Sequence, residues 1–167
     1  MLIRPERPAY DLAMMKFCYA DLRGGTPLSV DEMIERYFRL VSEIKAQRPD
    51  VKLVHITIPL KADPPGRKAK LKRFVGMSLE EDADNVLRNA FSQKLRERVA
   101  GEPLFDLASV ESTRADGSSS TFTQAGQERY SLAPEYTDDG GHLNALGRRR
   151  AAIEFVRVLA DALSGNS

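Results

Sequence analysis

The residues Val51-Lys-Leu-Val-His-Ile-Thr-Ile58 are the stretch that decides the fold of this chain. Leucine and β-branched residues fill most of these positions, and such residues favour extended backbone that is buried on both faces. Pro49 precedes the stretch and Pro59 follows it, and proline is poorly tolerated inside a buried strand. The pattern therefore predicts a strand that ends at Pro59.

The residues before this strand predict an amphipathic helix that follows another strand. Ser29 and Glu32 have the spacing of a capping box, in which each side chain satisfies a backbone N–H at a helix start. From Asp31 to Gln47 the large apolar residues recur every three or four positions and so share one face. They are Met33, Ile34, Tyr37, Phe38, Val41 and Ile44. Upstream, the mostly apolar run from Leu12 to Tyr19 predicts a second buried strand.

The residues after the strand at 51–58 continue the alternation of strands and helices. A second helix is expected to run to about Val99, and the capping-box spacing of Ser78 and Glu81 marks its start. The positions that we expect this helix to bury are Ala83, Val86, Leu87, Ala90, Phe91 and Leu95. Residues 104–108 predict a third, short strand.

The last third of the chain predicts a long loop and then a closing helix. Residues 113–135 show no regular pattern, and a loop of this length in a compact domain often lies near a site. The closing helix is expected from about 145 to 163, with Asn144 as its N-cap. Its expected buried stripe is Ile153, Val156, Leu159 and Leu163.

The order of these elements is strand, helix, strand, helix, strand, helix. This alternation predicts an α/β fold with three αβα layers, a parallel sheet and right-handed crossovers, as in flavodoxin-like domains. A chain of 167 residues is long enough for one domain with a sizeable core, so we expect residues 1–167 to form a single domain.

Composition narrows the functional classes. The net charge is +1, from 25 basic and 24 acidic residues, and gives no reason to expect a nucleic-acid partner. Cys18 is the single cysteine, so an internal disulfide and a cysteine-based zinc site are excluded. His55 and His142 are the only histidines, which argues against a multi-histidine metal site. We expect no metal, no organic cofactor and no membrane span, and the compartment stays unknown.

The most distinctive polar stretch is Asp139-Gly-Gly-His142, directly before the closing helix. The two glycines allow a tight turn that brings the carboxylate and the imidazole to one side. A carboxylate beside an imidazole fixes its tautomer and stabilises the imidazolium, as a general base requires. Asp21, Thr57, Pro59 and Glu111 also follow expected strands, so we expect them on the same rim of the sheet.

Each of these features also has a purely structural interpretation. Asp-Asp-Gly-Gly is ordinary turn chemistry, and His55 inside an apolar strand is expected to be a satisfied core or edge histidine rather than a ligand. Cys18 is expected to be buried and inert. The basic residues between 61 and 73 form either a solvated loop or a site for a phosphate or acidic substrate. The serines at 118–120 read as loop rather than as nucleophiles, because no Gly-x-Ser-x-Gly elbow surrounds them.

The three arginines Arg148, Arg149 and Arg150 stand in the first turn of the closing helix, where the helix dipole disfavours cations. Pairing with Asp138 or Glu135 would offset this, and so would an anionic ligand. The sequence leaves these alternatives open.

The block from Asp139 to Gly147 with its closing helix resembles the last sequence block of the SGNH (GDSL-like) hydrolases. The helix and strand from Tyr37 to Leu60 match the layout of that family, and Lys16-Phe-Cys-Tyr-Ala-Asp21 stands where its third block lies. The resemblance implies that His142 is the general base and Asp139 its orienting carboxylate. In this family the pair activates a serine that attacks an ester of a carbohydrate, a lipid or another small molecule.

The chain also departs from this family. No Gly-Asp-Ser block with a nucleophile precedes Leu12, and Ala20 stands where the family has an asparagine that donates to the oxyanion. Such a donor is typically worth about 2.7–4 kcal/mol in the transition state. The family has about five strands and we expect three, so the strand at 12–19 would be left with an open edge, which proteins usually cover.

Two main functional hypotheses follow, beside a third and weaker one, a flavodoxin-like signalling or nucleotide domain, which no Gly-rich phosphate loop after a strand supports. The first is an SGNH-type serine esterase domain that is N-terminally incomplete and weak or inactive as written. The second is a non-catalytic carbohydrate-binding or interaction module derived from a hydrolase. In either case we expect a dimer, or another chain, to cover the strand edge at 12–19 if no strand is encoded upstream.

Overall fold

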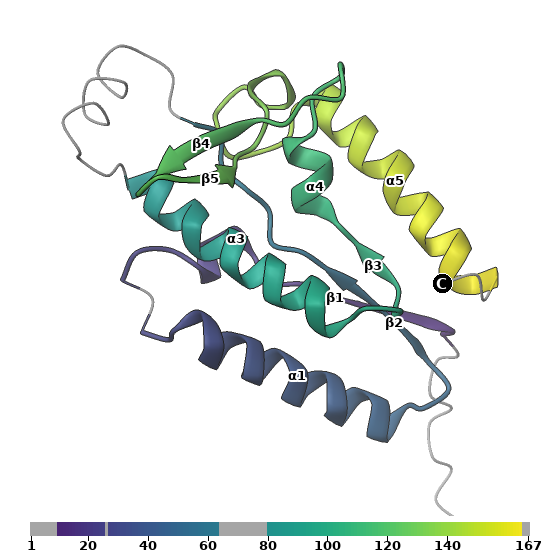
Figure 1. Ribbon diagram of the computed structural model, residues 1–167. Coiled ribbons are helices and arrows are strands. Elements are labelled where there is room, and N and C mark those ends of the chain that lie inside the picture. The colour runs from purple at the N-terminus through teal and green to yellow at the C-terminus, as the bar shows by residue number, and fades with distance from the viewer. Residues whose placement is uncertain (1–9, 26, 64–79, 165–167) are drawn as a thin grey trace, which may run out of the picture.

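The computed structural model describes residues 10–25, 27–63 and 80–164. A parallel sheet with the order β1-β2-β3 lies at its centre (Figure 1). Its strands are β1 (Leu12–Met15), β2 (Lys52–Ile56) and β3 (Leu104–Phe105). The central strand of this sheet is the one that the Val51 to Ile58 stretch predicts, with the register Ala13 opposite Leu53 and Ile56 opposite Phe105.

Helices cover the two faces of this sheet. Helices α1 (Val30–Gln47) and α3 (Glu80–Arg98) lie on one face, and α5 (Ala145–Ser164) lies on the other (Figure 1). Alternate residues of β2 point to opposite faces: Leu53 packs with α1 and α3, whereas Val54 packs with α5. The predicted α/β fold with three layers is therefore confirmed.

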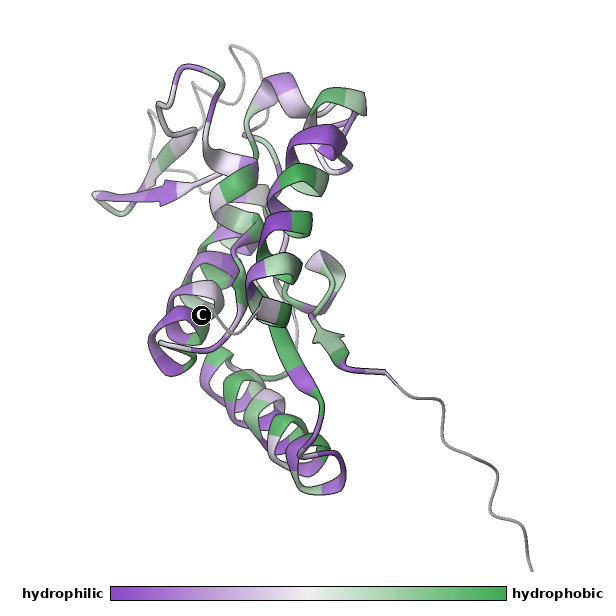
Figure 2. Ribbon diagram, turned by 90° about the vertical axis from the view of Figure 1, so that its right-hand side faces the viewer, coloured by the Kyte–Doolittle hydropathy of each residue, from purple (hydrophilic) through white to green (hydrophobic). Residues whose placement is uncertain are grey.

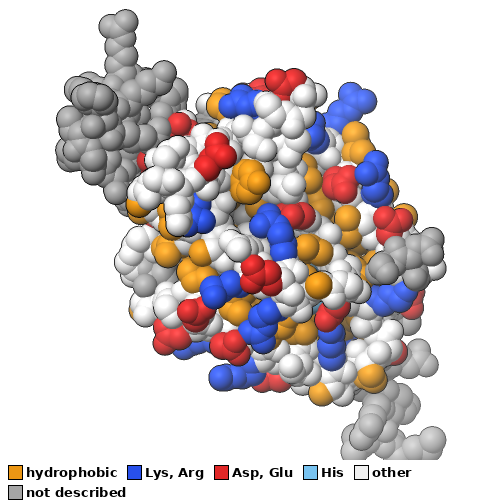
Figure 3. Space-filling model, viewed as in Figure 1, with side chains coloured by type: hydrophobic (Ala, Val, Ile, Leu, Met, Phe, Trp, Pro, Cys, Tyr) orange, Lys and Arg blue, Asp and Glu red, His pale blue; other side chains and the backbone are white. Residues whose placement is uncertain are grey.

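Local sequence explains α1 well. Ser29 is the N-cap and accepts the N–H of Glu32 at 3.2 Å, while the Glu32 carboxylate accepts the N–H of Ser29 at 2.8 Å. The predicted capping box is confirmed. Charged side chains of both signs alternate over the face that α1 and α3 present (Figure 3), and Lys94 of α3 pairs with Asp31 of α1 at 2.9 Å.

His55 is a core histidine, one of the two alternatives that its place in an apolar strand left open. The side chain is fully buried and lies 2.8 Å from the Tyr37 hydroxyl at Nδ1 and 3.1 Å from the Glu102 carboxylate at Nε2. Burial lowers the pKa of His55, so the ring is neutral near pH 7. Both contacts are satisfied when Nε2 carries the proton and Nδ1 accepts from Tyr37.

Two expected strand boundaries and the expected burial of Cys18 were wrong. The first strand ends at Met15, and a short 3-10 helix, η1 (Tyr19–Asp21), follows it. The third strand has two residues, because Asp106 caps a new helix, α4 (Leu107–Ser112), with its carboxylate on the N–H of Ser109 at 3.2 Å. Cys18 is exposed, not buried, since it lies in the turn between β1 and η1.

Residues 113–135 are more regular than expected. They hold an antiparallel hairpin of β4 (Thr121–Gln124) and β5 (Gln127–Tyr130), followed by a 3-10 helix, η2 (Pro134–Tyr136). Ala125 and Gly126 form the two-residue turn, and both have positive φ, the geometry that hairpin turns of this length require. Alanine at the first position gave no turn signal in the sequence.

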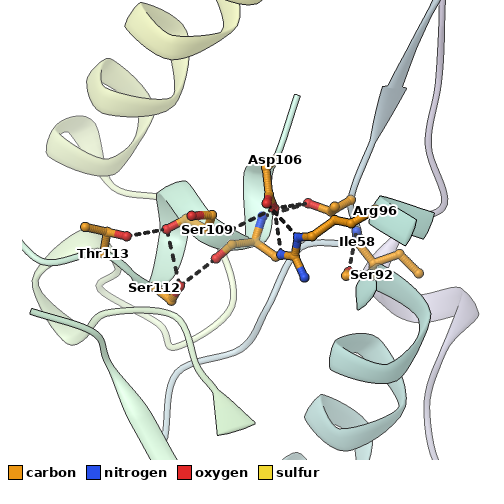
Figure 4. A network of polar contacts seen from close by, with 9 residues as sticks. Ile58, Ser92, Arg96, Asp106, Ser109, Ser112 and Thr113 are labelled. Carbon is orange, nitrogen blue, oxygen red and sulfur yellow. Dashed lines mark hydrogen bonds and ion pairs between the residues drawn. The ribbon is translucent and has the colours of Figure 1, made fainter. Parts of the chain in front are cut away.

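A polar network joins the ends of β2 and β3 to their neighbouring helices (Figure 4). Arg96 of α3 donates two hydrogen bonds to Asp106, at 2.6 and 2.8 Å. The Thr57 hydroxyl donates to the same carboxylate at 3.1 Å and accepts the N–H of Ala108 at 2.9 Å. Thr57 is fully buried, so its role is structural and it does not reach the rim.

Helix α5 has the predicted extent, but of its expected buried stripe only Leu159 packs on the sheet. Ile153, Val156 and Leu163 are 58%, 63% and 58% exposed. The residues that pack on the sheet are Ala151, Phe155, Val158, Leu159 and Ala162. The expected and the observed residues both have helical spacing, since apolar residues cover most of this helix. Figure 2 shows apolar and polar residues along each long helix.

Helix α3 was also only partly predicted. Phe91 and Leu95 are fully buried as expected, whereas Ala83, Val86 and Ala90 are half-buried. The first half of the helix instead buries a polar set: Asp82, Asp84, Asn85, Arg88 and Ser92. The expected capping residue Ser78 and most of the basic stretch at 61–73 lie outside the described residues.

The β1 side of the sheet is open within the described residues. β1 pairs with β2 and with no other strand there, and Met14 on it is 54% exposed. A cavity of about 430 Å³ lies beside it, lined by Met14, Lys16, Ile56, Phe105, Leu107 and Phe155. Among the described residues, no helix has the length and apolar character needed to cross a membrane.

Candidate functional site

The loop before α5 brings Asp139 and His142 together as predicted. The carboxylate Oδ2 lies 2.7 Å from the imidazole Nδ1, and both side chains are largely exposed. Gly140 has φ of 81°, a conformation that glycine adopts without strain and that folds the loop back on itself. Since Nδ1 faces the carboxylate, the opposite nitrogen, Nε2, is the one that can take a proton from a reacting group.

Asp139 is held by the backbone of its own loop. Its Oδ1 accepts the N–H groups of Gly141 at 2.8 Å and His142 at 2.7 Å. These backbone hydrogen bonds, followed by the contact with the imidazole, hold the pKa of the Asp139 carboxyl well below its usual range. The carboxylate therefore stays ionised and fixed in orientation, which suits the role of orienting a histidine.

Contacts from three directions position the loop. Asn144 caps α5 by accepting the N–H of Gly147 at 3.0 Å, and its amide donates to the Glu135 carbonyl at 3.0 Å. A Cβ at Gly147 would lie 2.7 Å from the Tyr136 carbonyl oxygen, so only glycine fits there. The N–H of Ala62 donates to the Gly140 carbonyl at 2.8 Å, which ties the loop to the chain after β2.

Two side chains from other elements flank the histidine. The Tyr19 ring of η1 lies edge-on to the imidazole, with ring centroids 5.9 Å apart and an interplanar angle of 82°. The Lys61 ammonium lies 5.6 Å from the centre of the same Tyr19 ring. Sequence reasoning expected Asp21 at this rim and missed Tyr19, two residues before it.

A buried arginine supports this rim from below. Arg88 of α3 is 1% exposed, and its guanidinium donates to the Tyr19 carbonyl at 3.0 and 3.2 Å. The same group donates to Asp84 at 3.1 Å and to Asn85 at 3.1 Å. Asp84 in turn accepts the N–H of Gly24 at 2.6 Å. The network therefore fixes the chain at Tyr19, where η1 begins, and at Gly24, after η1 ends.

No sequence motif singled out this network. Asp84, Asn85, Arg88 and Ser92 recur at helical spacing, which was a usable signal for a shared face. Polar residues at that spacing normally face water, so the sequence could not show that this face is buried.

Glu111, expected at the rim, lies buried beneath it in α4. It is 4% exposed, and its carboxylate accepts the N–H of Leu60 at 2.6 Å. Burial raises the pKa of this carboxyl to about 8, against the opposing effects of the Leu60 N–H and of the positive charges of Lys16 and Arg88. Glu111 is therefore largely protonated near pH 7.

Replacing Glu111 with glutamine is expected to remove a pH dependence of stability. The folded-state pKa is raised, so the folded protein binds the proton more tightly, and wild-type stability falls as pH rises from the unfolded value toward about 8. Between pH 5 and pH 7 the Glu111→Gln variant should gain roughly 2–3 kcal/mol relative to wild type. Urea unfolding at pH 5 and pH 7 measures the free energy of unfolding of both proteins, and the exposed Glu43→Gln is the control. Parallel pH profiles for wild type and Glu111→Gln would contradict the prediction.

The remaining candidates lie elsewhere. Ser118 bonds to Asp116 at 2.7 Å, and Ser120 is buried against Ser131 at 3.2 Å, so both serve the hairpin region. Ala20 lies exposed in η1.

Two of the three arginines at the start of α5 have partners other than Asp138 and Glu135. Arg148 donates to the Leu143 carbonyl at 3.0 Å, and Arg150 lies 5.5 Å from the Tyr136 ring centre. Glu135 pairs with Arg114 at 3.1 Å instead. Within the described part of the chain, no group of three or more side chains has a metal-binding arrangement.

Comparisons with known proteins give structural likenesses alone. No family model matches the chain, and no curated protein matches it. A solved structure described as "a putative platelet activating factor from Streptococcus pneumonia" has a TM-score of 0.58 at 16% identity, and the match covers 89% of this chain and 59% of that one. A "putative acylhydrolase" from Bacteroides fragilis has a TM-score of 0.55 at 17% identity, over 91% of this chain and 62% of that one.

These likenesses establish a shared α/β fold with two solved structures, one of which is described as a putative acylhydrolase. This chain spans about three fifths of the length of each of those two chains.

Proposed function

We propose that this chain carries the histidine and aspartate of an SGNH-type serine hydrolase that cleaves an ester of a carbohydrate or another small molecule. The observation that supports this most is the 2.7 Å contact between His142 Nδ1 and Asp139 Oδ2 on an exposed rim of the sheet. The shared fold with two solved structures, one of them described as a putative acylhydrolase, agrees with it.

The reaction would be acyl transfer in two steps. His142 Nε2 takes the proton of a serine hydroxyl as the serine oxygen attacks the ester carbonyl, and Asp139 stabilises the imidazolium that forms. The imidazolium then gives this proton to the leaving alcohol, and a serine ester remains. Water, activated by the same histidine, hydrolyses that ester and returns the serine.

The serine would come from polypeptide outside residues 1–167 that pairs with the open edge of β1. A strand parallel to β1 would have its carboxyl end at the same rim as β1. Ligands and reacting groups gather at the carboxyl ends of parallel strands, so a serine there could meet His142. The exposed Met14 and the open pairing edge support this placement, as does the greater length of the two similar structures. A second copy of this chain is the alternative occupant of that edge.

A non-catalytic, carbohydrate-binding module is the second candidate. Ala20 favours it, since an alanine side chain offers no donor to an oxyanion in the position where the resembling family has asparagine. The intact pairing of Asp139 with His142 favours the hydrolase.

A serine-reactive fluorophosphonate tests the proposal. The chain extended by the codons upstream of Met1 is expected to be labelled at one upstream serine, detected by mass spectrometry. The reason is that fluorophosphonates react with serines that an adjacent base has activated. Labelling should disappear in the His142→Ala variant and persist in the His55→Gln variant. Labelling that does not depend on His142, or no labelling at all, would favour the binding module.

A further inference from the structure

Three hydrogen bonds hold the backbone of Lys61 near the candidate base. Its N–H donates to the Asn85 side chain at 3.0 Å, and its carbonyl accepts from the Asn85 amide at 2.7 Å. The same carbonyl accepts the N–H of Leu132 at 3.0 Å. Asn85 is 1% exposed and is itself bonded to Arg88, so the attachment point of the Lys61 side chain is rigid.

The side chain of Lys61 runs toward the Asp139 to His142 loop. Its Cε lies 4.0 Å from the position that a Cβ on Gly141 would take, and its ammonium lies 5.6 Å from the centre of the Tyr19 ring. That ring is the one that contacts His142 edge-on. Lys61, Tyr19 and His142 thus line one small area of the rim.

The Lys61 ammonium has no carboxylate partner among the described residues, unlike Lys45 and Lys94, which form ion pairs. Two acids of the neighbouring elements are engaged elsewhere. Asp139 is bonded to its own loop and to His142, and Glu111 is buried and largely protonated. Arg88 lies 5.7 Å from the same ring, but its charge is paired with Asp84. The rim beside His142 therefore carries a positive charge that no described carboxylate pairs with.

We infer that Lys61 binds a negatively charged group of the substrate next to His142, so that the preferred substrate is an anionic ester. This inference rests on the proposed function and adds the substrate class. The Tyr19 ring would form the apolar side of the site and limit how deep the ester can sit. A fixed lysine suits such a role because it binds an anion as a point charge without demanding one geometry.

Matched pairs of small esters test this inference on the chain as it is. Diethyl pyrocarbonate modifies exposed imidazoles, and since His55 is fully buried, His142 is the reactive histidine. Monomethyl succinate places a carboxylate in the acyl half of an ester, and acetoxyacetate places it in the alcohol half. Dimethyl succinate and methyl acetoxyacetate are their neutral counterparts. The concentration at which each ester slows modification of His142, at constant ionic strength, gives its affinity.

At least one anionic ester is expected to bind about threefold more tightly than its neutral counterpart, the size of effect that an exposed ion pair gives. Which ester shows the preference identifies the half of the substrate that carries the charge. Lys61→Met should abolish the preference and Lys61→Arg should keep it. Lys94→Met, which removes the same charge from α3, should leave it unchanged, and His142→Ala supplies the blank.

Equal protection by charged and neutral esters, or a preference that survives Lys61→Met, would overturn the inference. These outcomes are separate from a failure of the proposed function. A charge preference without fluorophosphonate labelling of an extended chain would leave Lys61 as the anion site of a binding module, whereas labelling without a charge preference would leave a hydrolase of neutral esters.

Discussion

Replacing His142 with alanine is expected to lower ester hydrolysis by about 10⁴- to 10⁶-fold in a chain that carries the attacking serine. The reason is that Nε2 is the base for both steps, and the residues of such a triad act as a unit. Asp139→Asn should cost about 10⁴-fold, because the amide cannot stabilise the imidazolium and favours the wrong tautomer. The measurement is kcat/KM for a chromogenic acetyl ester.

The neighbouring acid provides the control for this experiment. Asp138 stands next to Asp139, but it contacts Asn144 at 3.3 Å instead of the imidazole, so Asp138→Asn should change the rate little. For the 167-residue chain without an added serine, wild type and His142→Ala should hydrolyse the ester equally slowly. Equal rates in the extended chain would eliminate His142 as the base.

Replacing Arg88 with methionine is expected to lower the free energy of unfolding by about 3–5 kcal/mol. The guanidinium holds the Tyr19 carbonyl, Asn85 and the buried Asp84, and methionine fills the space without donating to any of them. An uncompensated buried carboxylate and an unpaired carbonyl would remain. Urea unfolding of both proteins, followed by circular dichroism, measures the loss.

A surface arginine on the same helix gives the matched comparison. Arg98 pairs with Glu35 and lies 4.1 Å from the Phe38 ring centre, but its side chain is 42% exposed, so Arg98→Met should cost less than about 1 kcal/mol. Adding Asp84→Asn to Arg88→Met should recover part of the stability, because it removes the stranded charge. A loss at Arg88 no larger than that at Arg98 would mean that solvent or rearrangement satisfies the network.

The elements that sequence predicted best are those with strong local signals. The Ser29 and Glu32 capping box and the apolar stripe of α1 are contacts between residues three or four positions apart, so they exist as soon as the helix forms. The contact between Asp139 and His142 is of the same kind, since both residues belong to one short turn. For that reason the core of the candidate site could be located without coordinates.

The features that sequence missed depend on neighbours distant in the chain. Both faces of α5 are apolar, and the choice of Phe155 over Val156 for the sheet side is made by the helix's fit against β2 and β3. Arg88 looks like any solvent-facing residue until η1, 69 positions earlier, supplies the carbonyl that satisfies it. Tyr19 and Lys61 meet His142 only because the carboxyl ends of β1 and β2 converge beside the last loop.

The sequence by itself determined the αβα alternation, the strand within residues 51–58 and the pairing of Asp139 with His142, because apolar periodicity and short-range hydrogen bonds encode them within a few residues. Only the tertiary structure decided which helix faces are buried, that a buried arginine holds the backbone of Tyr19, and that a lysine with no carboxylate partner among the described residues lies near the candidate site. These depend on the free energy of burial, which is set by what packs across the sheet and not by the residues next in the chain.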